Sequence, residues 1–219
     1  DRAHMLLDQA RERARQLLGM FEVGRGGTTQ ARYERDVIEG SVQNRLGQLQ
    51  LGSASLIFGR IDFEADDRFY IGRLAVADEN QEPVVVDWRA PVAEPFYRAT
   101  GREPMGLIRR RHFISRGKEL LDIEDELFDL DQLDDGFQGH GALLAALDQN
   151  RDGQLRDIVS TIQGEQDEII RDPLKGRVIV QGGPGTGKTV VALHRAAYLL
   201  YTHRFPLEGQ GVLVVGPNR

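Results

Sequence analysis

The sequence has 219 residues, 40% of them hydrophobic, which is enough chain for one large or two small globular domains. Because it contains no cysteine, a disulfide framework, a thiolate zinc site and thiol catalysis are excluded. With 34 acidic and 28 basic residues it carries a net charge of −6, which disfavours direct coating of nucleic acid. No apolar run reaches the length of a membrane span and the first residues do not resemble a signal peptide, so we expect a cytoplasmic protein with no membrane partner.

Two amphipathic helical patterns begin the chain. Apolar residues recur at spacings of three and four from Leu6 to Phe21, and a second pattern runs from Ala31 to Leu51. A short glycine-rich loop joins them, which favours an antiparallel pair. Residues 1–51 are therefore predicted to form an antiparallel helical arm, which either projects from the protein or lies flat on it. The predicted partner-binding tip of this arm consists of Gly24, Arg25, Gly26, Gly27, Thr28, Thr29 and Gln30.

The residues after the arm change to a pattern typical of strands. Short segments rich in β-branched and aromatic residues lie at 55–63, 69–76 and 84–88. With a further hairpin around 116–118, they predict a small antiparallel β module over residues 52–130. Three arginines at 109–111 alternate between the two faces of an extended chain, so we expect them to pair with acidic residues at 119–135 rather than form one patch.

A complete phosphate-binding motif lies in the last third of the chain. The pattern G-x-x-x-x-G-K-[ST] is formed by Gly182, Gly183, Pro184, Gly185, Thr186, Gly187, Lys188 and Thr189. Its glycines allow backbone N–H groups to face phosphate oxygens, Lys188 supplies a charge to the β- and γ-phosphates, and Thr189 offers its hydroxyl to Mg²⁺. We expect no metal other than this Mg²⁺, because the histidines lack metal-ligand spacing.

The motif lies between a predicted strand at 177–181 and a predicted helix at 188–202, which is the context it requires. The same region is predicted to contain helices at 142–147 and 155–170 and a strand at 212–215. An acidic, glycine-containing stretch at 131–141 is the predicted linker. The expected fold class is therefore an α+β N-terminal region, with a helical hairpin and a β module, followed at 142–219 by the start of a RecA-like P-loop α/β domain.

A glutamine upstream of the motif favours ATP over GTP, because the amide of Gln166 can donate to and accept from an adenine edge at once. Together with the P-loop, the segment around Gln166 resembles the Q motif of superfamily 1 helicases of the UvrD/Rep kind. The helix after the loop also resembles that family, although Val190 stands where many members have arginine. Residues 212–219 are similar to motif Ia, which contacts single-stranded DNA in true helicases.

ATP hydrolysis needs two further elements. P-loop ATPases use a later apolar strand that ends in an acidic residue and holds Mg²⁺, and an arginine finger. The sequence ends before either element, so no catalytic set is complete, and we expect this stretch to bind ATP weakly at best and not to turn it over. Residues 84–87 imitate the acidic strand, but they lie far upstream of the P-loop, and Asp87 is expected to pair with Arg89 instead.

The first 130 residues resemble a narrower family. The resemblance is carried by residues 27–36, 70–74, 86–91, 95–97, 109–112 and 125–127. The most specific string is Asp87-Trp88-Arg89-Ala90-Pro91, and together they are similar to HelD, the helicase-like ATPase that binds bacterial RNA polymerase, in its actinobacterial form. The resemblance implies that the arm enters the polymerase secondary channel, that ATP turnover in the motor domains helps to release the factor or the nucleic acid, and that this chain is an N-terminal fragment.

Three functions remain open from the sequence. The favoured one is the N-terminal part of an ATP-dependent factor that binds bacterial core RNA polymerase and dissociates or recycles it from nucleic acid, with nucleic acid contacts made by the rest of the motor. The second is a superfamily 1 DNA helicase or translocase in repair, with an accessory N-terminus. The third is a nucleotide-binding regulatory module that never hydrolyses ATP.

Overall fold

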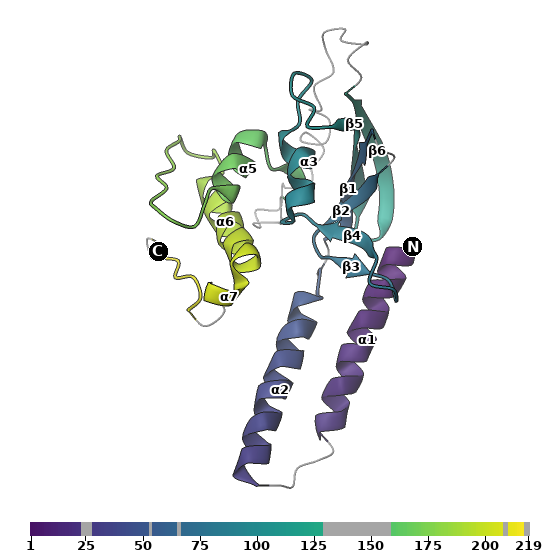
Figure 1. The fold of residues 1–219 in the computed structure, drawn as a ribbon, viewed down its shortest axis with the longest axis vertical. Coiled ribbons are helices and arrows are strands. Elements are labelled where there is room, and N and C mark those ends of the chain that lie inside the picture. The colour runs from purple at the N-terminus through teal and green to yellow at the C-terminus, as the bar shows by residue number, and fades with distance from the viewer. Residues whose placement is uncertain (23–27, 53, 65–66, 129–158, 208–209, 217–219) are drawn as a thin grey trace.

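A computed structural model describes residues 1–22, 28–52, 54–64, 67–128, 159–207 and 210–216 (Figure 1). Two long helices lead into a six-stranded sheet, and shorter helices cover one side of that sheet. The predicted linker at 131–141 and the predicted helix at 142–147 lie outside the described residues. No helix in the described part of the chain is both long enough and apolar enough to cross a membrane.

Helices α1 (Arg2–Glu22) and α2 (Thr29–Gln48) lie side by side and project away from the sheet (Figure 1). This arrangement confirms the predicted antiparallel pair and decides in favour of a projecting arm. Residues 24–27 of the predicted tip lie outside the described residues, whereas Thr29 and Gln30 belong to the first turn of α2.

The arm is anchored at its base. A buried apolar cluster joins the arm to the sheet and consists of Ala3, Leu6, Leu7, Leu49, Leu56, Val76 and Val85. Beside it, the guanidinium of Arg11 donates to the carbonyl oxygen of Leu49 from Nε at 2.9 Å and from Nη2 at 2.7 Å, which ties α1 to the end of α2. Farther along the arm, Met20 is 74% exposed and Tyr33 is 71% exposed. The base of the arm therefore belongs to the folded core, while its outer part offers apolar side chains to the solvent.

The sheet contains six strands in the order β3-β4-β2-β1-β5-β6. Their bounds are β1 Ile57–Phe63, β2 Arg68–Gly72, β3 Val76–Ala77, β4 Pro83–Asp87, β5 Leu107–Arg116 and β6 Glu119–Leu127. Strands β2 and β4 are parallel, so the prediction of a purely antiparallel module was wrong. The reason is that the chain passes to the outer strand β3 before it turns back, and the returning β4 then lies between β3 and β2.

The hairpin of β5 and β6 confirms the expected pairing of the three adjacent arginines with acidic residues of 119–135. Arg110 donates to Glu126 at 2.5 Å, and Arg111 forms two bonds of 2.5 Å to Asp125. Arg109 lies 3.9 Å from Asp125, and its closer partner is Asp62 of β1, to which its Nε donates at 2.7 Å. Since these cations are engaged by carboxylates, they do not form a single basic patch.

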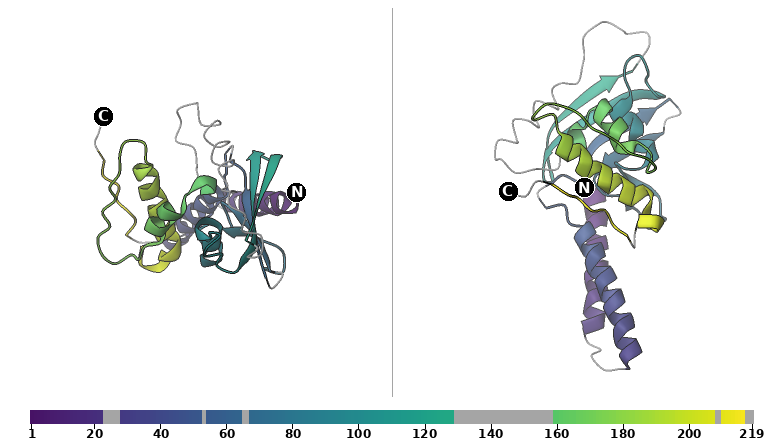
Figure 2. Two further views of the ribbon diagram at one scale, coloured as in Figure 1. Left: turned by 90° about the horizontal axis from the view of Figure 1, so that it is seen from above. Right: turned by 90° about the vertical axis from the view of Figure 1, so that its left-hand side faces the viewer.

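One side of the sheet is covered by helices α3 (Glu94–Arg98), α5 (Gly164–Arg171) and α6 (Lys188–Thr202), with α3 placed between the sheet and the other two (Figures 1 and 2). A single buried cluster includes Phe58 of β1, Phe96 of α3, Ile170 of α5 and Val191 of α6. The P-loop helix therefore packs into the same core as the β module.

Helix α5 begins later than predicted. The apolar pattern predicted a helix over 155–170, but in the described residues a short 3-10 turn at Val159–Thr161 comes first and α5 starts at Gly164. Gln163 has an extended backbone and forms a capping box with Gln166, which sets the start of the helix. The predicted helix at 188–202 agrees with α6, whose last turn is followed by the short helix α7 (Arg204–Leu207).

The two predicted strands that flank the P-loop helix are absent: residues 177–181 and 212–215 form no ladder in the described structure. Ile179 is 83% exposed and Leu213 is 88% exposed. Their apolar pattern suits buried strands, but a strand forms only when a neighbouring strand bonds its backbone, and no described strand pairs with either segment. The described structure is thus a mixed α+β region in which no P-loop domain is evident.

Gly59 shows how closely α3 approaches β1. A Cβ atom at this position would lie 2.2 Å from Cε2 and 2.5 Å from Cζ of Phe96. The Phe96 ring is 2% exposed and packs edge-on against Phe58, with the ring centroids 5.5 Å apart. Because the ring is held on several sides, it has little room to move away from an added methyl group.

We predict that Gly59→Ala lowers the free energy of unfolding by about 1–3 kcal/mol, because overpacking a filled core is costly. Urea unfolding followed by far-UV circular dichroism measures the change. Gly47→Ala in α2 is the control: nothing lies within 4 Å of the added Cβ, and alanine favours a helix over glycine by up to about 1 kcal/mol. A Gly59→Ala variant as stable as the parent would contradict the described packing.

Candidate nucleotide-binding site

The phosphate-binding motif forms a tight loop that leads directly into α6. Gly185 has φ of 79° and Gly187, the residue before the helix, has φ of 83°. Side chains with a Cβ rarely adopt this left-handed conformation, so glycine is required at both positions. Lys188 is the first residue of α6, and the N–H groups of the first helical turn have no acceptor within the helix. The loop therefore ends at a group of N–H donors with partial positive charge, which suits phosphate.

Two side chains of the motif bond to the loop itself. Nζ of Lys188 donates to the carbonyl oxygens of Gly182 at 2.8 Å and Gly183 at 2.5 Å, and the hydroxyl of Thr186 donates to Gly183 at 3.0 Å. The ammonium group of Lys188 thus lies over the loop, where it can exchange these carbonyl oxygens for phosphate oxygens. Thr189 is exposed in the first turn of α6. These donors fit a nucleotide phosphate with Mg²⁺.

Gln166 lies beside the loop, as its predicted role requires. Its Nε2 atom is 3.2 Å from the position that a Cβ on Gly187 would occupy. Its Oε1 atom accepts a hydrogen bond of 3.2 Å from the backbone N–H of Gln163. One oxygen lone pair is therefore engaged by the capping box, and the amide N–H₂ is the part of Gln166 that faces the P-loop.

Asp87 is held by its neighbour in the sequence, as expected. Its carboxylate accepts bonds from Nε of Arg89 at 2.7 Å, from Nη2 at 2.6 Å and from the Arg89 backbone N–H at 2.9 Å. The guanidinium of Arg89 also lies 4.6 Å from the ring centre of Tyr201 at the end of α6. Asp87 is thus a buried structural carboxylate, and the turn that follows it rests against the P-loop helix.

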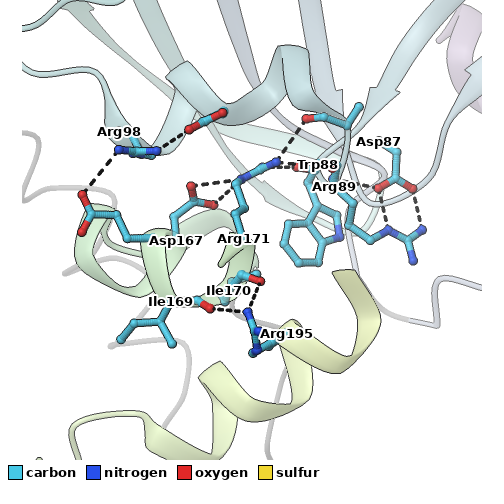
Figure 3. A network of polar contacts seen from close by, with 12 residues as sticks. Asp87, Trp88, Arg89, Arg98, Asp167, Ile169, Ile170, Arg171 and Arg195 are labelled. Carbon is cyan, nitrogen blue, oxygen red and sulfur yellow. Dashed lines mark hydrogen bonds and ion pairs between the residues drawn. The ribbon is translucent and has the colours of Figure 1, made fainter. Parts of the chain in front are cut away.

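Arg171 connects this turn to α5 (Figure 3). Its Nη2 atom donates to the carbonyl oxygen of Trp88 at 2.8 Å, and Nη1 donates to those of Arg89 at 3.3 Å and Ala90 at 3.4 Å. Its Nε atom donates to both carboxylate oxygens of Asp167, at 2.9 and 3.0 Å. The side chain of Arg171 is 7% exposed and that of Asp167 is 0% exposed. One buried guanidinium therefore bonds three successive carbonyl groups of the β module and a carboxylate of α5.

Burial also changes the pKa of Asp167. Loss of water raises the pKa of the Asp167 carboxyl above its usual value, and the neighbouring Arg171 guanidinium partly offsets that rise.

Arg195 completes the junction from α6, because its Nη1 atom donates to the carbonyl oxygens of Ile169 at 2.8 Å and Asp172 at 2.7 Å (Figure 3). The free carbonyl groups at the end of α5 are thus bonded by a side chain of the P-loop helix.

A family model described as the N-terminal domain of DNA helicase IV HelD matches residues 1–140, which is more than half of the chain. The chain belongs to this family. The part that matches HelD contains the helical arm, the six-stranded sheet and the Asp87–Pro91 string, and it ends before Gln166 and the P-loop. Helicases are ATPases, so membership in the HelD family implies ATP and Mg²⁺ for a full-length member. No curated protein matches the chain.

Sequence reasoning found the P-loop and Gln166 but missed Arg171, Asp167 and Arg195. Asp167 and Arg171 are four residues apart, a spacing that allows an ion pair on a helix. That spacing gives no sign that both are buried or that Arg171 reaches the turn after β4. No local pattern marks Arg195, because its acceptors are backbone carbonyl groups on another helix.

Proposed function

We propose that this chain is the arm and nucleotide-binding portion of an ATP-dependent factor that dissociates or recycles bacterial core RNA polymerase from nucleic acid. The observation that carries the nucleotide part is the P-loop geometry, in which Lys188 begins α6 after two left-handed glycines and Gln166 lies beside Gly187. Membership in the HelD family supports this assignment.

ATP bound with Mg²⁺ would supply the chemical energy for the factor. The loop N–H groups and Lys188 would bind the β- and γ-phosphates, and Thr189 would place its hydroxyl by the metal. The N–H₂ group of Gln166 would donate to N7 of adenine, and the second lone pair of Oε1 would accept from the adenine N6–H₂ group, where guanine has an acceptor instead. We assign hydrolysis to the RecA-like motor of a complete protein, since the described residues contain no acidic strand beside the P-loop.

The arm is the proposed polymerase-binding element. Two helices held only at their base project from the body, and their outer part exposes Met20, Tyr33 and Val37. Exposed aromatic and methionine side chains are enriched at the centres of protein interfaces. The projecting shape suits insertion into a narrow channel, which is the role that the HelD resemblance implies.

We predict that the chain binds ATP and that Lys188→Ala weakens binding about tenfold or more, because a charge-assisted hydrogen bond contributes about 1.5–3 kcal/mol. The measurement is a titration with a fluorescent ATP analogue in the presence of Mg²⁺. Lys175→Ala is the control, since Lys175 is an exposed lysine outside the motif. Equal affinities of the parent and Lys188→Ala would refute the assignment of the phosphate site.

We predict that ATP displaces the analogue better than GTP and that Gln166→Ala reduces this preference about fivefold, the equivalent of one hydrogen bond of about 1 kcal/mol. Alanine removes the donor to N7, which both purines share, and the acceptor for the N6–H₂ group, which only adenine has. Gln163→Ala removes the other half of the capping box and should leave the preference unchanged. If the parent binds ATP and GTP equally, Gln166 does not read the base.

We predict that Met20→Gln and Tyr33→Gln each weaken capture of purified core RNA polymerase about tenfold, as loss of an interface anchor does. Glutamine keeps the helical propensity of the arm. Phe205→Gln is the control, because Phe205 is 94% exposed on α7, which is not part of the arm. Capture that is unaffected by either arm variant would contradict the assignment. Tight binding of single-stranded DNA without polymerase capture would instead favour a repair helicase.

A further inference from the structure

The turn at residues 88–90 touches both helices that carry nucleotide-site residues. On α5, Arg171 bonds its three carbonyl groups, as described above. On α6, the ring of His194 lies 5.6 Å from the ring of Trp88, measured between centroids. The guanidinium of Arg171 also lies 5.3 Å from the ring centre of Tyr198 on α6. The turn is therefore a shared support for α5 and α6.

Helix α5 joins this support to the P-loop over a short distance. It has eight residues, with Gln166 in its first turn and Arg171 at its end. Asp167, which follows Gln166 directly, is the carboxylate that holds Arg171. A displacement of the turn would move Arg171 and Asp167, and it would move Gln166 with them because a helix of two turns transmits motion as a rigid body.

The energetics favour a positioning role for this ion pair. A buried pair seldom stabilises a protein more than apolar residues of the same volume would, whereas breaking it leaves an uncompensated buried charge. Arg171 has donors in a fixed planar arrangement, which a lysine cannot reproduce. Its bonds to Trp88, Arg89 and Ala90 thus fix the orientation of α5 against the sheet.

We propose that Arg171 is a positioning residue that sets the placement of Gln166 beside the P-loop and thereby couples nucleotide binding to the six-stranded sheet. This inference rests on the proposed ATP site. Coupling is reciprocal in free energy. A partner that shifts the sheet therefore changes the affinity for ATP, and ATP changes the environment of the turn.

The first test uses Trp88, the single tryptophan of the sequence, as a reporter in the parent protein. Saturating Mg²⁺ and ATP are expected to change its fluorescence emission, and the change should be absent in Lys188→Ala. Unchanged emission in a parent shown by displacement to be saturated with ATP would overturn the coupling while leaving the nucleotide site intact. A parent that binds no nucleotide would overturn the proposed function and the coupling together.

The second test compares Arg171→Lys with Gln166→Ala in the ATP and GTP displacement assay. Because Arg171 acts through the base-reading residue, Arg171→Lys should reduce the preference for ATP about fivefold. The double variant should show no further reduction. A purely structural loss would instead weaken ATP and GTP equally. Arg98→Gln is the control, since Arg98 makes an exposed 3.5 Å bond to Glu168 of α5 without touching the turn. An unchanged preference in Arg171→Lys, or an equal loss in Arg98→Gln, would overturn the inference.

Discussion

The carbonyl groups that follow β4 need hydrogen-bond donors, and the packing of the described structure depends on how that need is met. Three successive carbonyl groups, of Trp88, Arg89 and Ala90, turn away from the sheet and face α5. Leaving such groups buried without partners would be costly. Arg171 bonds all three and carries its own counter-charge in Asp167, so the turn and α5 are fixed to each other. The P-loop helix α6 packs on the same core and bonds the end of α5 through Arg195.

The residues of the Asp-Trp-Arg-Ala-Pro string have different roles at this junction. Asp87 holds Arg89 and so shapes the turn, Trp88 fills the core beside α6, and Pro91 starts the 3-10 turn that leads to α3. The arm obeys a different constraint. Its base is buried against β3 and β4, but its outer apolar residues contact water. The described part of the HelD N-terminal domain thus combines a packed body that contacts α6 with a projecting pair of helices.

Local patterns predicted the parts of the fold that local interactions decide. The spacing of apolar residues predicted both arm helices and α6, and the short β-branched and aromatic segments predicted the strands of the sheet except β3. The segment predicted at 69–76 divides into β2, which ends at Gly72, and β3, which begins at Val76. The parallel pairing of β2 and β4 was missed because it depends on where the chain returns after β3. The strands predicted at 177–181 and 212–215 were wrong for a related reason, since an apolar run becomes a strand only beside a partner. The capping box of Gln163 and Gln166 sets the start of α5 at Gly164, later than predicted. Both glutamines can be read in the sequence, but the prediction did not use them.

The residues of the candidate site likewise divide into those that a local pattern marks and those that it does not. The P-loop and Gln166 are short motifs whose spacing predicts phosphate and base contacts, and the structure places Gln166 beside Gly187. Arg171 acts on carbonyl groups more than eighty residues upstream, which no local pattern reveals. The assignment of Asp87 to Arg89 was confirmed because both residues belong to one turn.

The central claim is that the proposed nucleotide site packs against the HelD N-terminal region and is coupled to it in free energy. Amide hydrogen exchange with and without Mg²⁺ and ATP tests this claim most directly, because it reports both segments in a single experiment. The account predicts slower exchange on ATP binding at residues 182–189 of the P-loop and also at residues 88–90 of the turn. Slower exchange at neither segment, or at the P-loop alone, would contradict it.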